Sequence, residues 1–256
     1  MRRDMTKYIF KRTMHVIRFG ALLMLTASMA LSMALIGCIA SDTAAYDLSS
    51  MRARTPKARK PHGSAEVRRL KTKDSDGIAF RLKVDGTRID YPVMAQRPSD
   101  PDGFYLTHTP SRKKSILGSL YLDRESSPDG KHLLIYGHRL GSSNLMFSPL
   151  SGCWHQDHFD RLSSLEIIDA QESRSFSALC SMQVDMSFGD IRRFDFTDDR
   201  ELQAWLGALC DESSARARDW RGLIREADGV CSTVTCSGKE GGRMRTIVIW
   251  AESESP

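Results

Sequence analysis

The sequence predicts a mostly β domain of about 180 residues that follows an N-terminal membrane segment. Three observations lead to this fold class. From residue 77 onward, short runs of β-forming residues are separated by clusters of Pro, Gly, Asp and Ser, as in β-sandwiches and barrels. One late segment has the apolar spacing of an amphipathic helix. Near the N-terminus, residues 19–40 contain no charged side chain.

Composition and charge limit the function classes. Of 256 residues, 41% are hydrophobic and 27% charged, which excludes collagen-like, coiled-coil and wholly disordered chains. The net charge of +5 is unevenly divided. Residues 1–75 carry 15 Lys and Arg against 5 Asp and Glu, whereas residues 76–256 carry 22 against 27. The folded part is therefore mildly acidic, and we expect no nucleic-acid partner.

The N-terminal segment is expected to anchor the chain in a membrane. Residues 1–18 are basic, and the 22 uncharged residues 19–40 are long enough to cross the hydrocarbon layer as a helix. The leading interpretation is an uncleaved signal anchor with the N-terminus inside the cell. The alternative is a lipoprotein signal, because residues 35–38 resemble a bacterial lipobox in which Cys38 would carry the lipid.

A basic stalk is expected to join this anchor to the domain. Residues 41–75 mix Ser, Ala, Pro and basic residues without apolar periodicity, which is typical of a flexible spacer. In either form of anchoring, the domain at 76–256 is expected on the extracellular face of the cell membrane.

The domain begins with a predicted β-hairpin. In Ile78–Val84 apolar and other residues alternate, Asp85-Gly86 favours a tight turn, and Thr87–Val93 returns. Further β-rich runs are Ser115–Leu122, His132–Tyr136, Leu165–Asp169, Phe176–Val184, Val230–Thr235 and Arg245–Trp250.

A helical insertion is predicted before the Val230 strand. Asp198 can cap a helix whose apolar residues recur at i, i+3, i+4 and i+7. A weaker helical pattern follows over 215–226. The apolar residues of the first helix are Leu202, Trp205, Leu206 and Leu209.

Three side chains at strand ends form a candidate nucleophilic site. Cys236 ends one strand before a Gly-rich loop, Arg245 begins the next strand, and His138 follows the strand that ends at Tyr136. A thiolate can attack a carbonyl, an imidazole can protonate the leaving group, and a guanidinium can stabilise the oxyanion. Taken singly, each has an ordinary explanation: a buried Cys, a turn His and an edge-strand Arg.

The order of these motifs resembles the sortase family, class B. That family carries a Tyr-Gly-His segment, a Thr-Leu-Ser-Thr-Cys segment and an Arg that opens the next strand. The matching segments here are 136–138, 232–236 and 245–249. Ile89–Val93, Phe104–Leu106, Gly118–Asp123 and Met146-Phe147 also follow in family order, so the resemblance extends over nearly all of 76–251.

The resemblance implies an eight-stranded sortase β-barrel with a helical insertion before the Cys strand, and a cofactor-free transpeptidation. Cys236 would cleave a C-terminal sorting signal, LPXTG-like or NPQTN-like, through a thioester. His138 would act as acid and base, and Arg245 would stabilise the oxyanion. The implied partners are secreted proteins that carry the signal and an amine acceptor on a cell-wall precursor or a pilin. The expected substrate-binding residues are Tyr136, Leu106, Val234 and Thr235.

Two departures from the family pattern affect specificity and the catalytic Arg. Val234 replaces a Ser that helps line the family's groove, so the preferred motif is expected to differ. Arg243 and Arg245 share strand parity, and the register against the apolar run favours Arg245.

Two other function classes stay open. One is a catalytically inactive, surface-anchored β-barrel binding module, and the other is a hydrolytic cysteine peptidase. No metal site is expected, because His155 and His158 have no third ligand in view and the cysteines lack zinc spacing. Cys153, Cys180, Cys210 and Cys231 allow two disulfides in three pairings.

Overall fold

The computed structural model describes residues 24, 26–34, 36–37, 77–141, 143–169, 173–237 and 242–253. The chain divides into two units after residue 45, and the residues described in the first unit are helical. Within the described residues, no helix is long and apolar enough to cross a membrane. The anchor predicted at 19–40 lies partly outside them, and the segments 1–18 and 41–75 lie wholly outside, so all three stay predictions.

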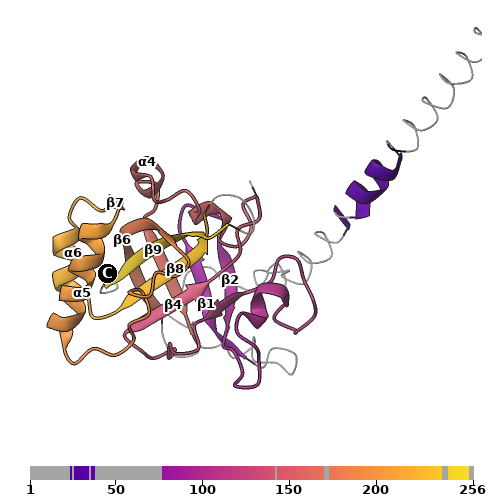
Figure 1. Ribbon diagram of the computed structural model, residues 1–256. Coiled ribbons are helices and arrows are strands. Elements are labelled where there is room, and N and C mark those ends of the chain that lie inside the picture. The colour runs from indigo at the N-terminus through magenta and orange to yellow at the C-terminus, as the bar shows by residue number, and fades with distance from the viewer. Residues whose placement is uncertain are drawn as a thin grey trace, which may run out of the picture. The chain divides into compact units, whose positions relative to one another are not determined.

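The second unit contains a closed barrel of eight strands (Figure 1). Their order is β5-β1-β2-β3-β4-β8-β9-β6, and β6 closes the barrel by pairing with β5. The β2–β3 and β4–β8 pairs are parallel, and the others are antiparallel. The bounds are β1 (Ile78–Val84), β2 (Asp90–Met94), β3 (Leu120–Leu122), β4 (His132–Tyr136), β5 (Ser164–Ile168), β6 (Ser173–Asp185), β8 (Val230–Cys236) and β9 (Met244–Ser253).

The predicted strands are found, with two shortened by local structure. The first hairpin turn contains Gly86 at φ 76°, but the strands end at Val84 and resume only at Asp90. The Thr87 hydroxyl donates to the Val84 carbonyl at 2.8 Å and accepts from Ile89 N–H at 3.0 Å, which stabilises the longer turn. In the run predicted at 115–122, only β3 forms a strand.

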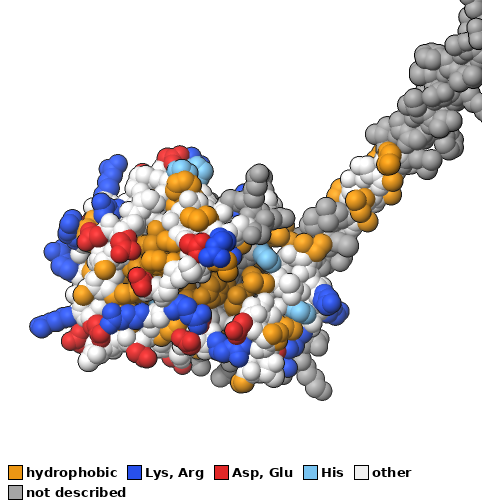
Figure 2. All heavy atoms as spheres, in the orientation of Figure 1, with side chains coloured by type: hydrophobic (Ala, Val, Ile, Leu, Met, Phe, Trp, Pro, Cys, Tyr) orange, Lys and Arg blue, Asp and Glu red, His pale blue; other side chains and the backbone are white. Residues whose placement is uncertain are grey.

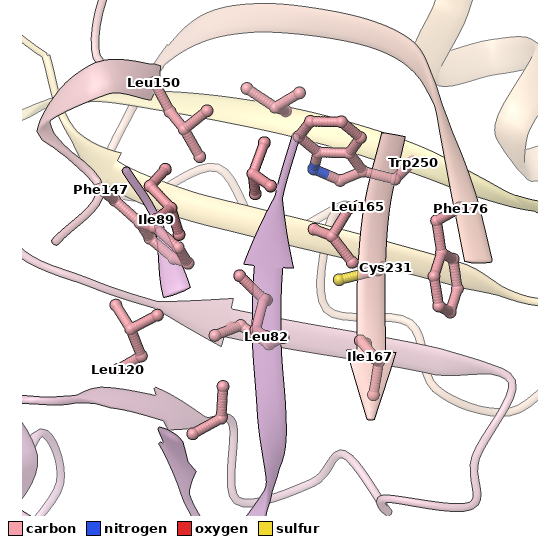
Figure 3. Close-up of a cluster of buried hydrophobic side chains, with 14 of the residues drawn as sticks. Leu82, Ile89, Leu120, Phe147, Leu150, Leu165, Ile167, Phe176, Cys231 and Trp250 are labelled. Carbon is pink, nitrogen blue, oxygen red and sulfur yellow. The ribbon is translucent and has the colours of Figure 1, made fainter. Parts of the chain in front are cut away.

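The barrel interior is apolar and fully enclosed. Alternate residues of β1, β4, β8 and β9 point inward because side chains along a strand alternate between faces. The Trp250 indole N–H donates to the buried Thr233 hydroxyl at 3.1 Å, so the largest interior side chain has its polar group satisfied. Figure 3 shows this cluster, including Leu82, Ile89, Leu120, Phe147, Leu150, Leu165, Ile167, Phe176, Cys231 and Trp250.

Two helices cover part of the outer face of the barrel. They are α5 (Asp199–Glu212) and α6 (Trp220–Glu226), which pack side by side and lie between β6 and β8 in the chain (Figure 1). The Asp198 side chain accepts a hydrogen bond from Glu201 N–H at 2.9 Å, as its capping position predicts. The four apolar residues predicted for this helix are all buried: Leu202, Trp205, Leu206 and Leu209.

The second helix is shorter than predicted. Residues Ala215–Arg216 form the two-residue strand β7 on the edge of β6, and Asp219 caps a helix that begins only at Trp220. The remaining short helices are η1 (Phe104–Thr107), η2 (Ser148–Leu150) and α4 (Gln156–Phe159).

A buried histidine joins β4 to the helical insertion. The His132 ring is bonded through Nδ1 to the Arg193 carbonyl at 2.7 Å and through Nε2 to the Ser232 hydroxyl at 2.9 Å. It packs against the rings of Phe194 and Trp205. Burial lowers the pKa of His132 from 6.5 to about 4, so the ring is neutral in the folded protein near pH 7.

Because the unfolded chain binds a proton at His132 below pH 6.5 and the folded chain does not, stability falls as the pH drops from 6.5 towards 4. We expect this group to reduce the free energy of unfolding by about 2 kcal/mol between pH 7 and pH 5. Urea unfolding at the two pH values measures the loss. His132→Gln should remove most of the pH dependence, whereas a substitution at the exposed His155 should leave it unchanged. If the free energy of unfolding changed equally with pH in the wild type and in His132→Gln, the pH dependence could not be attributed to His132.

Candidate active site

Cys236 and Arg245 face each other across an antiparallel pair. In the β8–β9 register, Cys236 is the Cα partner of Arg245, and the pairing continues without a shift to Val230 and Ala251. Directly opposed residues in such a pair point to the same face of the sheet. This antiparallel pair therefore places the guanidinium and the thiol on one face of the sheet.

His138 lies at the same end of the sheet. β4 and β8 are parallel and pair Tyr136 with Val234, and the Gly137 N–H extends this ladder by donating to the Val234 carbonyl at 3.1 Å. His138 follows Tyr136 by two residues, as Cys236 follows Val234, so both residues come just after the last pair of this parallel register. The three predicted residues thus come from three neighbouring strand ends, although almost 100 residues separate the first from the second.

The structure distinguishes Arg245 from Arg243. The Arg243 guanidinium is exposed and forms two hydrogen bonds with the Asp185 carboxylate, at 2.7 and 2.9 Å, and this interaction lowers the pKa of Asp185. Arg245 donates to the main-chain carbonyls of Gly242 and Met244, at 2.7 and 3.0 Å. Arg243 is therefore bound to an acidic partner, whereas Arg245 lies opposite the thiol.

The outer face beside these residues is apolar and aromatic. Val234 is 6% exposed and packs in the cluster beneath the helices, while Tyr136 contacts both that cluster and the one that includes Leu106. Figure 2 shows hydrophobic side chains gathered over the middle of the face on which Figure 1 shows β4 and β8. Tyr136, Val234 and Leu106 thus contribute to the apolar clusters on this face, and their assignment to substrate binding stays a prediction.

Tyr121 is a further aromatic residue on this face, next to Tyr136. Its ring stacks on Tyr136, with centroids 5.3 Å apart. Burial and the charge of Asp123 raise the pKa of Tyr121, while the positive charges of Arg192 and Arg245 act in the opposite direction. Tyr121 therefore lies beside Tyr136 on the same face of the sheet. The signal in the sequence was its position two residues before Asp123, in the segment Gly118–Asp123 that resembles the family.

A buried carboxylate holds the aromatic pair. Asp123 is 4% exposed, accepts a hydrogen bond from the Tyr136 hydroxyl at 3.0 Å and contacts the Arg192 guanidinium at 3.2 Å. Burial, followed by the nearby Asp123 charge, raises the pKa of Tyr136, which therefore stays neutral and donates its proton to this carboxylate. The arrangement fixes the orientation of the Tyr136 ring.

Thr235 does not share this face. It precedes Cys236 on β8, so its side chain points to the opposite side of the sheet, where it is 3% exposed. Its hydroxyl has no hydrogen-bond partner within the part of the chain that the structure describes. The geometry corrects the expectation for this residue, because its side chain lies towards the barrel interior rather than in the groove.

Cys236 is the most accessible of the cysteines that the structure describes. It is half-buried, whereas Cys153, Cys180, Cys210 and Cys231 are at most 2% exposed, and all five are free thiols. Burial raises the pKa of Cys153 to about 12 and raises those of Cys180 and Cys231 as well. The four buried thiols are therefore shielded from reagents, and three of them also resist ionisation at neutral pH.

No metal centre is found among the residues described: no three His, Cys, Asp or Glu side chains are grouped to bind an ion. His155 precedes α4, and His158 on that helix contacts Asp157 at 3.6 Å. The Gly-rich loop at 238–241 lies outside the described residues.

No family model and no curated protein matches the sequence. Solved structures do match. Clostridium perfringens sortase B is 23% identical with a TM-score of 0.62, and the match covers 73% of this chain and 99% of that one. The chain has the fold of class B sortases.

Two further class B sortases match over most of their length. Staphylococcus aureus sortase B is 19% identical with a TM-score of 0.63, over 82% of this chain and 92% of that one. Bacillus anthracis sortase B is 15% identical with a TM-score of 0.68, over 86% and 100%. The S. aureus protein is also known in complex with a substrate, and a sortase B is known in complex with triglycine. The resemblance seen in the sequence is thus confirmed at the level of the fold.

We expect alkylation by iodoacetamide at neutral pH to modify Cys236 faster than the four buried cysteines, by roughly tenfold or more, because burial shields the other four thiols from the reagent. Mass spectrometry of the individual Cys peptides measures each rate separately. Equal rates in urea provide the control that the difference comes from the fold. Equal rates in the native protein would contradict the placement of Cys236.

Proposed function

We propose that this protein is a sortase-type cysteine transpeptidase. The observation that carries the proposal is the direct pairing of Cys236 with Arg245, beside the end of β4 that bears His138, in a barrel with the class B sortase fold. A thiol, an imidazole and a guanidinium on one accessible face are the groups that acyl transfer through a thioester requires.

In the first half-reaction, the Cys236 thiolate attacks the carbonyl carbon of the scissile peptide bond. Negative charge develops on the carbonyl oxygen, and the Arg245 guanidinium stabilises it. Protonated His138 then gives its proton to the leaving amine as the C–N bond breaks. The products are a thioester on Cys236 and the released C-terminal fragment of the substrate.

In the second half-reaction, an amine attacks the thioester. His138, now neutral, accepts a proton from the attacking nitrogen, an amide bond forms and the Cys236 thiolate leaves. The electron pairs and protons balance without an oxidant or a metal, so the proposed reaction uses no cofactor.

The apolar outer face and the structural relatives support the proposed substrate class. An extended peptide with a C-terminal sorting signal, LPXTG-like or NPQTN-like, fits an apolar face lined by Tyr136, Leu106 and Val234. The proposed acceptor is an amine on a cell-wall precursor or a pilin. Solved complexes of sortase B with a substrate and with triglycine support a peptide donor and an amine acceptor.

We place the enzyme at the cell membrane, with a single span at 19–40, the N-terminus inside and the catalytic domain outside. The uncharged run, the basic residues of 1–18 and the lack of basic residues in 41–51 support this orientation. Such a position would give the site access to secreted substrates.

The decisive experiment offers the full-length chain a library of sorting-signal peptides together with a small amine, and follows Cys236 by mass spectrometry. A thioester that converts into an amide product supports the transpeptidase. An adduct that releases only acid would indicate a hydrolytic cysteine peptidase instead. No adduct with any peptide, on a folded protein with Cys236 free, would indicate a surface-anchored binding module.

Arg245→Ala should lower kcat by about 10²- to 10³-fold, as expected when an oxyanion donor is removed. Arg243→Ala is the matched control, because it removes the same charge two residues away, where the guanidinium is bound to Asp185. It should change kcat less than about threefold. Turnover of the selected peptide measures both. A larger decrease of kcat in Arg243→Ala than in Arg245→Ala would show that Arg243, not Arg245, is the catalytic Arg.

A further inference from the structure

The His138 ring makes a short hydrogen bond that the reaction scheme above does not use. Its Nε2 atom lies 2.6 Å from the main-chain carbonyl oxygen of Leu106. A carbonyl oxygen can only accept a hydrogen bond, so Nε2 must carry the proton. In neutral His138 the lone pair is then on Nδ1, and in the protonated ring Nδ1–H is the proton that remains free to transfer.

We propose that the Leu106 carbonyl is a positioning group for His138, which holds the ring in its Nε2–H tautomer and makes Nδ1 the atom that exchanges protons with substrate. This inference rests on the proposed function for its catalytic meaning. A main-chain acceptor here does what a carboxylate does for the His of other nucleophilic sites, since it fixes both tautomer and ring orientation.

The backbone of His138 is fixed independently of this bond. Phe147 N–H donates to the His138 carbonyl at 3.0 Å, and Gly137 N–H donates to Val234. At Gly137 a Cβ would lie 2.4 Å from the Leu120 side chain and 2.6 Å from the Phe147 ring, so the chain passes here in close contact with the barrel core. With the backbone held, the direction of the ring is what the Leu106 carbonyl determines.

The carbonyl itself is held by the segment that follows η1. Leu106 N–H donates to the Gly103 carbonyl at 2.9 Å, which closes the turn of η1. Ser119 N–H donates to the Tyr105 carbonyl at 2.7 Å, and Ser115 N–H donates to the Thr107 carbonyl at 2.9 Å. The carbonyls on either side of Leu106 are thus both occupied by the 115–119 segment, and the Leu106 carbonyl is the one directed at His138.

Gly118 makes this arrangement possible. It has φ 61°, and a Cβ at this position would lie 2.4 Å from the Leu106 carbonyl oxygen and 2.7 Å from its carbonyl carbon. These neighbours are backbone atoms, so they can give way only if η1 shifts. Gly118 is therefore an indirect positioning residue. Replacing it would displace the Leu106 carbonyl, which in turn orients His138.

The first test needs no variant. In the full-length protein with ¹⁵N-labelled histidine, long-range ¹H–¹⁵N spectra should show His138 as the Nε2–H tautomer when neutral, with the signal assigned by its loss in His138→Gln. An Nδ1–H tautomer would overturn the proposal. Because this readout does not use the reaction, it is independent of whether the transpeptidase activity is found.

The second test compares Gly118→Ala with Gly86→Ala. Gly86 has φ 76°, so Ala is strained there in the same way, but its Cβ would meet only the Arg161 carbonyl at 3.6 Å. Gly118→Ala should give a mixture of His138 tautomers, a roughly tenfold or greater loss of kcat and a shifted pH profile, with KM changed less than about threefold. Gly86→Ala should keep the wild-type tautomer, kcat and pH profile.

The outcomes separate the two proposals. Turnover by wild type with His138 as the Nδ1–H tautomer overturns the positioning role alone. The Nε2–H tautomer in a protein that forms no thioester with any peptide overturns the proposed function and supports the tautomer assignment. A folded Gly118→Ala that keeps both the wild-type tautomer and kcat overturns the role of Gly118. If that variant does not fold, the wild-type spectrum still decides the assignment.

Discussion

The pairing of β8 with β4 on one side and β9 on the other is the constraint on which the candidate site depends. Arg245 follows Cys236 after one loop, whereas His138 precedes Cys236 by almost 100 residues in the chain. Register alone brings them together: a parallel pair places the end of β4 beside Cys236, and an antiparallel pair places Arg245 opposite it. A shift of one residue in either pair would turn a side chain to the other face.

The two faces of these strands pack against different parts of the protein. Inward residues form a closed apolar core in which even the Trp250 indole has a hydrogen-bond partner. Outward residues are covered by α5 and α6 at the start of β4 and β8, where His132 binds the insertion. The ends of the same strands carry Tyr136 and Cys236, and Arg245 lies opposite Cys236 near the start of β9. The helical insertion therefore rigidifies one end of the sheet and leaves the other accessible.

The sequence predicted much of this fold because its signals are local. Strand alternation, the Asp198 cap and the apolar spacing of α5 act within a few residues, so they can be recognised without the tertiary structure. β7 could not be predicted in the same way, since Ala215–Arg216 is a strand only because β6 lies beside it. The first hairpin is longer than Asp85-Gly86 suggested because the Thr87 hydroxyl binds the backbone of the turn.

The candidate site also combines features that the sequence predicts with features that it does not. Cys236 and Arg245 flank one loop, so their approach follows from a simple hairpin. His138 was selected because it follows the strand that ends at Tyr136, and the resemblance supports that choice.

Other features of the site could be recognised only from the tertiary structure. The role of Tyr121 depends on stacking across β3 and β4 and on charges from distant segments, which no local pattern contains. Thr235 was assigned to the groove from its place in a motif, although strand parity already sets it on the other face from Cys236. The register against the apolar run already favoured Arg245 over Arg243, and the binding of Arg243 to Asp185 adds a tertiary reason for that choice.

The position of β9 also has a consequence for how the protein is made. It follows the other strands of the sheet in sequence, yet it lies between β8 and β6. During synthesis, β6 and β8 therefore keep unpaired edges until β9 has been made, and the barrel cannot close around its core before then. Cys236 acquires the neighbours that define its surroundings in this last step. The thiol is therefore assembled into a site only when the whole domain is complete, and a chain that stops short of β9 has a cysteine but no site.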